Sequence, residues 1–180
     1  MSVAVVIVPP EGGVTLATDT RSQIDARWID HGPKMVERNG WMFAWVGEGI
    51  VERALRDGTV HNTDDPLAYI DGALLWLKER GALGHDGSTE SVFIASDGAR
   101  AWVIDGVGAL CQIVDRGEYA AVGAGAGEAL GALHILHPAA PTVAPHLAAM
   151  MAVNAAVRWS GACGGYAAGA QYVNGVWSTA

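Results

Sequence analysis

The sequence predicts an α+β fold in which strands and helices form separate layers. The predicted strands occur in hairpin-linked groups and the predicted helices occur in blocks, instead of alternating one by one along the chain. No repeat, linker or low-complexity tract divides the 180 residues. This length is typical of one domain with a substantial core. We therefore expect residues 1–180 to form a single domain.

Two hairpins are predicted in the N-terminal part of the chain. Runs rich in β-branched residues at 3–8 and 14–18 flank the turn-forming segment Pro-Pro-Glu-Gly-Gly. The segments 35–37 and 41–46 flank Arg-Asn-Gly, and Asn-Gly is a strong signal for a tight hairpin turn. Four strands should therefore precede the first helix.

Helices and strands then follow in blocks. A short helix is expected over 49–56, and a longer one over 66–80, where Pro66 suits the first turn and Asp64 or Asp65 can cap it. Apolar runs predict strands at 91–96, 101–104, 111–114 and 119–122. Two helices, from the glycine-rich segment 123–127 to about residue 137 and over 146–159, precede closing strands within 166–177.

The composition limits the functional classes. Hydrophobic residues make up 51% and charged residues 17%, which is apolar for a monomer, so we expect subunits that cover part of the surface. The net charge of −8, with no run of Lys or Arg, argues against nucleic-acid binding. No segment has the length of a membrane span or the basic start of a signal peptide. Two distant cysteines form no disulfide framework, which favours a cytoplasmic location.

Three polar residues near the N-terminus predict nucleophilic chemistry. Removal of Met1 would leave Ser2 with a free α-amine, whose reference pKa of about 7.7–8.0 suits a general base. One residue would then supply both nucleophile and base. A buried Lys34 beside it would keep the amine neutral, and Asp19 would keep that lysine ionised and oriented.

The segment around Asp19 resembles a signature of a known protein family. Residues 13–21, Gly-Val-Thr-Leu-Ala-Thr-Asp-Thr-Arg, are similar to the proteasome β-subunit signature, in which a strand ends in Asp-x-Arg. Lys34 lies as far from Ser2 as the family's catalytic lysine lies from its N-terminal threonine, and Asp19 falls one residue late. The segments 41–47, 122–129 and 156–165 resemble family segments in the same order. The resemblance thus covers most of the chain, and its length is closest to bacterial HslV-type subunits and other bacterial proteasome homologues.

The resemblance implies an N-terminal-nucleophile (Ntn) hydrolase with a four-layer αββα sandwich. It implies peptide-bond hydrolysis inside stacked homo-oligomeric rings of six or seven subunits, fed with unfolded protein or peptides by an unfoldase ATPase. Ser2 stands at the nucleophile position, and Asp19 and Lys34 stand at the positions of the catalytic acid and lysine. Gly47 stands where a backbone N–H helps to form the oxyanion hole.

Other positions of the family pattern concern substrate and supporting groups. Thr20 and Arg21, inside the signature, are expected to bind substrate. Ala124 replaces the serine of the family's Gly-Ser-Gly segment, Ser160 stands where many relatives have aspartate, and Cys163 replaces the serine of Ser-Gly-Gly. These three departures leave open a second function, that of a non-catalytic ring or scaffold subunit with the same fold.

Two alternative sites carry weaker signals. The glycine-rich segment 123–127 follows a strand and opens a helix, as in nucleotide-binding loops, but its spacing is Gly-x-Gly-x-Gly, and close packing of the backbone explains it better. His134 and His137 share a helix face, but no third ligand is evident. We therefore expect no metal and no cofactor, and we interpret the chain as a threonine-peptidase-type endopeptidase with a serine nucleophile.

Overall fold

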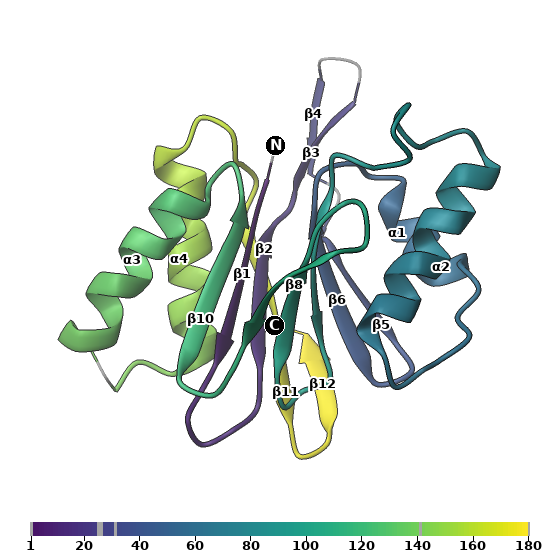
Figure 1. Ribbon diagram of the computed structural model, residues 1–180. Coiled ribbons are helices and arrows are strands. Elements are labelled where there is room, and N and C mark those ends of the chain that lie inside the picture. Colours follow the sequence, from purple (N-terminus) through teal and green to yellow (C-terminus); the bar gives the residue numbers. More distant parts are fainter. Residues whose placement is uncertain (1, 25–26, 31, 141, 180) are drawn as a thin grey trace.

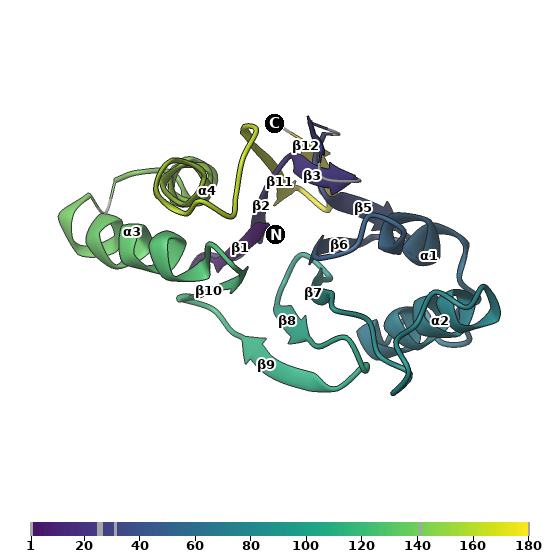
Figure 2. The ribbon, with the colours of Figure 1, turned by 90° about the horizontal axis from the view of Figure 1, so that it is seen from above.

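The chain folds into four layers, as predicted. The computed structural model describes residues 2–24, 27–30, 32–140 and 142–179 (Figure 1). Two five-stranded sheets pack face to face, and a pair of helices covers the outer face of each sheet (Figures 1 and 2). This arrangement confirms the α+β class, and the order of strands and helices matches the prediction except that six strands, not four, precede the first helix.

The first sheet has the strand order β10-β1-β2-β11-β12, and all its pairings are antiparallel. Its strands are β1 (Val3–Val8), β2 (Thr15–Asp19), β10 (Glu118–Gly123), β11 (Ala167–Val173) and β12 (Val176–Thr179). In the register, Val3 lies opposite Gly123, and Asp19 lies opposite Ala167. The start of β1, the end of β2, the end of β10 and the start of β11 therefore lie at one end of the sheet.

The second sheet has the order β5-β6-β7-β8-β9, again antiparallel. Its strands are β5 (Met35–Arg38), β6 (Trp41–Val46), β7 (Val92–Ser96), β8 (Ala101–Ile104) and β9 (Leu110–Val114). Asn39 and Gly40 join β5 to β6 with φ angles of 52° and 82°. Positive φ at both positions suits a type I′ turn, as the Asn-Gly pair predicts.

Four helices form the outer layers of the described chain: α1 (Val51–Asp57), α2 (Pro66–Glu79), α3 (Ala126–Ala139) and α4 (Pro145–Trp159). Asp65 caps α2, because its side chain accepts a hydrogen bond of 2.9 Å from the N–H of Leu67. The first helix begins two residues later than the predicted start at residue 49. The N–H groups of Val51 and Glu52 still bond three residues back, to Glu48 and Gly49, so the chain enters α1 through a tighter turn.

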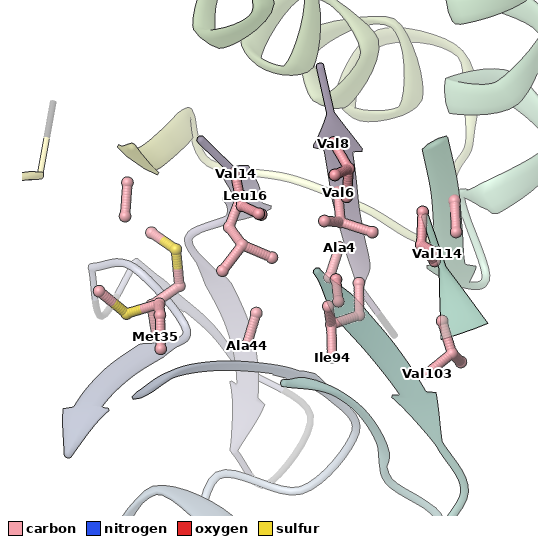
Figure 3. Packing of buried hydrophobic residues seen from close by; sticks show 14 of the residues in the cluster. Ala4, Val6, Val8, Val14, Leu16, Met35, Ala44, Ile94, Val103 and Val114 are labelled. Atoms are coloured by element: carbon pink, nitrogen blue, oxygen red, sulfur yellow. The ribbon is translucent and has the colours of Figure 1, made fainter. Parts of the chain in front are cut away.

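Three apolar clusters hold the layers together. Figure 3 shows the cluster between the sheets, where Leu16 and Val6 of the first sheet face Ala44 and Ile94 of the second. Large aromatic and aliphatic side chains fill the space between the second sheet and helices α1 and α2. The cluster under α3 and α4 is built largely from alanine, which lets these helices approach the first sheet closely. Each fully buried Leu or Ile stabilises the fold by about 1.5–3 kcal/mol.

The structure contains one hairpin that the sequence did not predict. It consists of β3 (Arg21–Ile24) and β4 (Arg27–Asp30), which pair only with each other. In Figure 1 it projects at the end of the sandwich where the chain begins. Its segments, Arg-Ser-Gln-Ile and Arg-Trp-Ile-Asp, lack the long β-branched runs that identify strands in a sequence. Residues 25 and 26, which join the strands, lie outside the described chain.

Candidate active site

The three residues predicted to act together form one buried cluster. The Nζ of Lys34 donates hydrogen bonds to the Oγ of Ser2 at 2.6 Å and to Oδ1 of Asp19 at 2.9 Å. Ser2, Lys34 and Asp19 are 3%, 4% and 0% exposed. Ser2 precedes β1, Asp19 ends β2 and Lys34 precedes β5, so the cluster joins the two sheets at the end marked by the N-terminus in Figure 1.

Asp19 is held by donors from three parts of the chain. Its Oδ1 accepts from the N–H of Val3 at 3.1 Å as well as from Lys34, and its Oδ2 accepts from the N–H of Gly164 at 3.2 Å. Several charge-assisted hydrogen bonds fix the orientation of a carboxylate. Asp19 therefore ties the start of β1 and the loop before β11 to the lysine.

Lys34 is fixed at both its backbone and its side chain. Its N–H donates to Oγ1 of Thr18 at 3.1 Å, and its carbonyl oxygen accepts from the N–H of Trp45 at 3.2 Å. The Nζ also donates to the carbonyl oxygen of Arg21 at 2.5 Å. With Ser2 and Asp19, the Nζ thus has three partners.

Burial lowers the pKa of Lys34 below its usual 10.5, while the charge of Asp19 and its hydrogen bond to Asp19 act in the opposite direction. These three partners can form hydrogen bonds with the Lys34 amine in both its protonated and its neutral state. An ammonium group can donate to all three, and a neutral amine can donate to Asp19 and Arg21 while its lone pair accepts from the hydroxyl of Ser2. The site therefore favours a lysine that can exchange a proton with Ser2.

Gly47 follows the last residue of β6 and has a φ of 117°, which only glycine adopts without strain. A Cβ at this position would lie 2.6 Å from the Oγ of Ser91. Gly123 links this turn to Ser2, because a Cβ there would contact the Ser2 carbonyl oxygen and lie 3.0 Å from Cγ1 of Val46. Among the described residues, no hydrogen bond occupies the N–H of Gly47.

Thr20 and Arg21 lie beside the cluster. Thr20 is fully buried, and its Oγ1 accepts from the N–H of Tyr166 at 3.0 Å. Arg21 is partly buried, and its side chain lies over Gly164, where a Cβ would come within 2.5 Å of the Cδ of Arg21. The backbone of Arg21 contacts both Lys34 and Gly164, since its N–H donates to the Gly164 carbonyl oxygen at 3.3 Å. Their role in binding substrate stays a prediction.

The three departures from the family pattern differ in burial. Ala124 is exposed, whereas Ser160 and Cys163 are buried. Burial, helped by the negative charge of Asp19, raises the pKa of the Cys163 thiol from 9.0 to about 11, so the thiol is neutral near pH 7. A Cβ on Gly125 would lie 2.5 Å from the Sγ of Cys163, so the glycine-rich segment packs directly against this thiol.

Neither alternative site gains support from the geometry. Gly125 is needed for close packing, as the sequence suggested for the glycine-rich segment. The Nδ1 of His134 pairs with the hydroxyl of Tyr119 at 2.6 Å. Within the described part of the chain, no three His, Cys, Asp or Glu side chains are grouped closely enough to bind a metal ion. In the same residues, no helix is long and apolar enough to cross a membrane.

The structure also contains site contacts that the sequence does not predict. They include the backbone donors of Val3 and Gly164 to Asp19, and the contact of Ser91 with the Gly47 turn. The backbone donors carry no side-chain signal in the sequence. Ser91 precedes β7 and is far from Gly47 along the chain, so no local pattern connects the two residues.

Comparisons with known proteins support the fold. No protein-family model and no curated protein matches the sequence. Among solved structures, Thiobacillus denitrificans BPH, also solved in complex with epoxomicin, superposes with a TM-score of 0.77 at 18% identity, over 94% of this chain and 97% of that chain. Eukaryotic HslV from Trypanosoma brucei superposes with a TM-score of 0.64 at 16% identity, over 100% of this chain and 98% of its own. In its fold, the chain is therefore HslV-like, a four-layer αββα sandwich.

Proposed function

We propose that the chain is a peptidase subunit that hydrolyses peptide bonds with Ser2 as its N-terminal nucleophile. The observation that carries this proposal is the buried contact of 2.6 Å between the Nζ of Lys34 and the Oγ of Ser2, supported by the ion pair of Lys34 with Asp19. A serine hydroxyl is a weak nucleophile until a neighbouring group accepts its proton. This cluster supplies such a group.

The proposed reaction begins with removal of Met1, which gives Ser2 a free α-amine. The Oγ of Ser2 then attacks the carbonyl carbon of the scissile bond, and its proton passes through Lys34 to the α-amine. The N–H of Gly47 stabilises the negative charge that develops on the carbonyl oxygen. The protonated amine releases its proton to the leaving amine of the substrate, and water hydrolyses the acyl-enzyme.

Lys34 has a more direct role in this scheme than the one inferred from sequence. The sequence predicts that it tunes the α-amine, but its Nζ contacts the hydroxyl of Ser2 itself. Burial lowers the pKa of Lys34, so a larger fraction of the amine is neutral near pH 7 than in an exposed lysine. A neutral Lys34 can take the hydroxyl proton, while Asp19 keeps its Nζ in place.

We further propose that the subunits assemble into stacked rings of six or seven copies in the cytoplasm, with peptides or unfolded protein as substrates and an unfoldase ATPase as partner. The outer helices support assembly, because Ile135 on α3 is 68% exposed and Leu147 and Met151 on α4 are about half exposed. Exposed apolar side chains of this size favour contact with another subunit. The free thiols of Cys111 and Cys163 agree with a reducing compartment.

A specific observation favours a second candidate, a non-catalytic ring or scaffold subunit. At the position where many relatives have aspartate, Ser160 offers only a hydroxyl, which interacts with the neighbouring thiol of Cys163. The cluster thus lacks an accessory carboxylate at this position. A scaffold subunit would need the fold and the assembly surfaces, but no reactive Ser2.

The test is hydrolysis of a panel of fluorogenic peptides by the assembled protein, together with its Ser2→Ala and Ser2→Thr variants. We expect Ser2→Ala to abolish hydrolysis and Ser2→Thr to retain it, because threonine keeps the hydroxyl and the α-amine. Ser178→Ala is the matched control, since Ser178 is exposed on β12. Hydrolysis that survives in Ser2→Ala would refute the proposed nucleophile, and a wild-type chain that cleaves no peptide would favour the scaffold.

A further inference from the structure

A ring of hydrogen bonds starts and ends on the residue that follows Gly47. The N–H of Glu48 donates to the Oγ of Ser91 at 3.0 Å. The Oγ1 of Thr89 lies 3.1 Å from the Oγ of Ser91 and donates to Oε2 of Glu48 at 2.7 Å. Backbone and side chain of Glu48 are therefore both tied to the segment that leads into β7.

The directions of these hydrogen bonds form a consistent chain. Because a carboxylate is the stronger acceptor, the hydroxyl proton of Thr89 goes to Glu48, and the Oγ1 of Thr89 can accept from the hydroxyl of Ser91. The Oγ1 of Thr89 also accepts from the N–H of Ser91 at 3.3 Å. Linked hydrogen bonds of this kind polarise and strengthen one another.

The segment that holds Glu48 is itself fixed. Ser91 is 1% exposed and Thr89 is 7% exposed. The N–H of Thr89 donates to the carbonyl oxygen of Gly106 at 3.1 Å, and a side chain at Gly106 would collide with the carbonyl oxygen of Thr89. The ring therefore connects the Gly47 turn to the buried segment before β7, which is itself tied to the segment after β8.

Gly47 packs directly against this segment. A Cβ at Gly47 would lie 2.6 Å from the Oγ of Ser91, 2.7 Å from its Cα and 3.0 Å from the carbonyl oxygen of Glu90. The preceding residue, Val46, is held by its pairing with Val92 in β7. The peptide groups on both sides of Gly47 are thus anchored, which restricts the direction of its own N–H.

We propose that Ser91 is a positioning residue, which acts with Thr89 and Glu48 to aim the N–H of Gly47 at the developing oxyanion. This inference rests on the proposed function of the chain as an Ntn peptidase. Electrostatic stabilisation requires donors that are already in place before reaction, because reorientation during the reaction would cost part of the gain. The ring meets this requirement from outside the cluster of Ser2, Lys34 and Asp19.

The first arm of the test is kinetic. Ser91→Ala should lower kcat about tenfold and leave KM within about twofold, because loss of a whole oxyanion donor costs about 10²–10³ in kcat and this change only misdirects one. Thr89→Val should also lower kcat, and Thr89→Ser, which keeps the hydroxyl, should restore it. Ser96→Ala is the matched control, since Ser96 is a fully buried serine at the other end of β7, where its hydroxyl accepts from the N–H of Gly98 and donates to the carbonyl oxygen of Arg100.

The second arm does not depend on activity. Hydrogen exchange measured by mass spectrometry on the peptide containing Gly47 and Glu48 should be at least about tenfold faster in Ser91→Ala than in the wild type, because the Glu48 N–H loses its acceptor. It should be unchanged in Ser96→Ala. Unchanged exchange in Ser91→Ala, or a kcat equal to that of Ser96→Ala in an active protein, would overturn the positioning role. A wild-type chain that cleaves no peptide would overturn the proposed function, and the exchange rates would still decide whether Ser91 holds the turn.

Discussion

The Nζ of Lys34 lies 2.6 Å from the Oγ of Ser2, and the exposed fraction of both residues is below 5%. The two residues come from different sheets of the sandwich, one before β1 and the other before β5. Burial lowers the pKa of this lysine, so a larger fraction of its amine is neutral near pH 7 and can accept the proton of the hydroxyl that it contacts.

Replacement of Lys34 separates proton transfer from the effect of positive charge. Lys34→Met should lower kcat by about 10²–10⁴, the usual contribution of a positioned proton acceptor. Lys34→Arg should be equally impaired, because a guanidinium group keeps the charge but does not release its proton. Activity is measured with the best peptide found for the wild type.

Both Lys34 variants must first be shown to fold and assemble like the wild type. Lys34→Met leaves Asp19 buried without its charge partner, which costs about 3–5 kcal/mol of stability. Circular dichroism and size-exclusion chromatography must therefore show an intact assembly before kinetics are compared. A Lys34→Arg variant with near wild-type kcat would contradict proton transfer through Lys34 and leave it an electrostatic role.

Stability should depend on pH through Lys34 in a defined direction. Burial places the pKa of Lys34 in the folded chain below the 10.5 of the unfolded chain, so the folded chain loses this proton first as pH rises. The unfolded chain then binds more protons, and the free energy of unfolding increases with pH in that window. Below the folded-state pKa, both states are protonated and the cost of burying the charge is fully present.

The measurement compares urea unfolding of the wild type and Lys34→Met at a series of pH values from about pH 7 up toward the reference lysine pKa of about 10.4. The wild type should gain stability relative to the variant as pH rises. A difference that stays constant, or that shrinks, would mean that burial does not lower the pKa of Lys34. Comparison with the variant removes the contributions of other groups that titrate in both proteins.

Gly47 should tolerate no side chain. Gly47→Ala adds a Cβ 2.6 Å from the Oγ of Ser91 at a φ of 117°, so the turn must shift and its N–H must move. We expect kcat to fall by about 10²–10³, as for loss of an oxyanion-hole donor. Steady-state kinetics should show this loss with a smaller change in KM.

Gly127→Ala is the matched control for this substitution. Gly127 lies in the first turn of α3, and a Cβ there would meet nothing within 4 Å outside the backbone of its own helix. Alanine favours the helix by up to about 1 kcal/mol, so this variant should be active and slightly more stable. Equal activity of both variants would contradict the role of Gly47 in the reaction.

Much of the fold could be predicted from the sequence because most strands and helices are bounded by residues with strong local preferences for turns or helix caps. The Asn39–Gly40 turn and the Asp65 cap were found where they were expected. The cluster of Ser2, Asp19 and Lys34 followed from their spacing and the family resemblance, and the structure brings the three side chains together.

What the sequence did not predict depends on contacts between distant or weakly marked segments. The β3–β4 hairpin has polar strands without a clear periodic pattern. The contact between Glu48 and Ser91 joins residues 43 positions apart, and a buried serine hydroxyl gives no local signal of its partner. The direct contact of Lys34 with the hydroxyl of Ser2 likewise depends on how the two sheets pack.

The most direct test of the central claim is intact-mass and peptide-mapping mass spectrometry of the protein before and after treatment with a peptide epoxyketone. We expect a mature chain that lacks Met1, a single probe adduct on Ser2, and no adduct on Ser2→Ala. A mature chain that retains Met1, or a wild-type Ser2 that stays unmodified at saturating probe, would contradict the assignment of Ser2 as the N-terminal nucleophile.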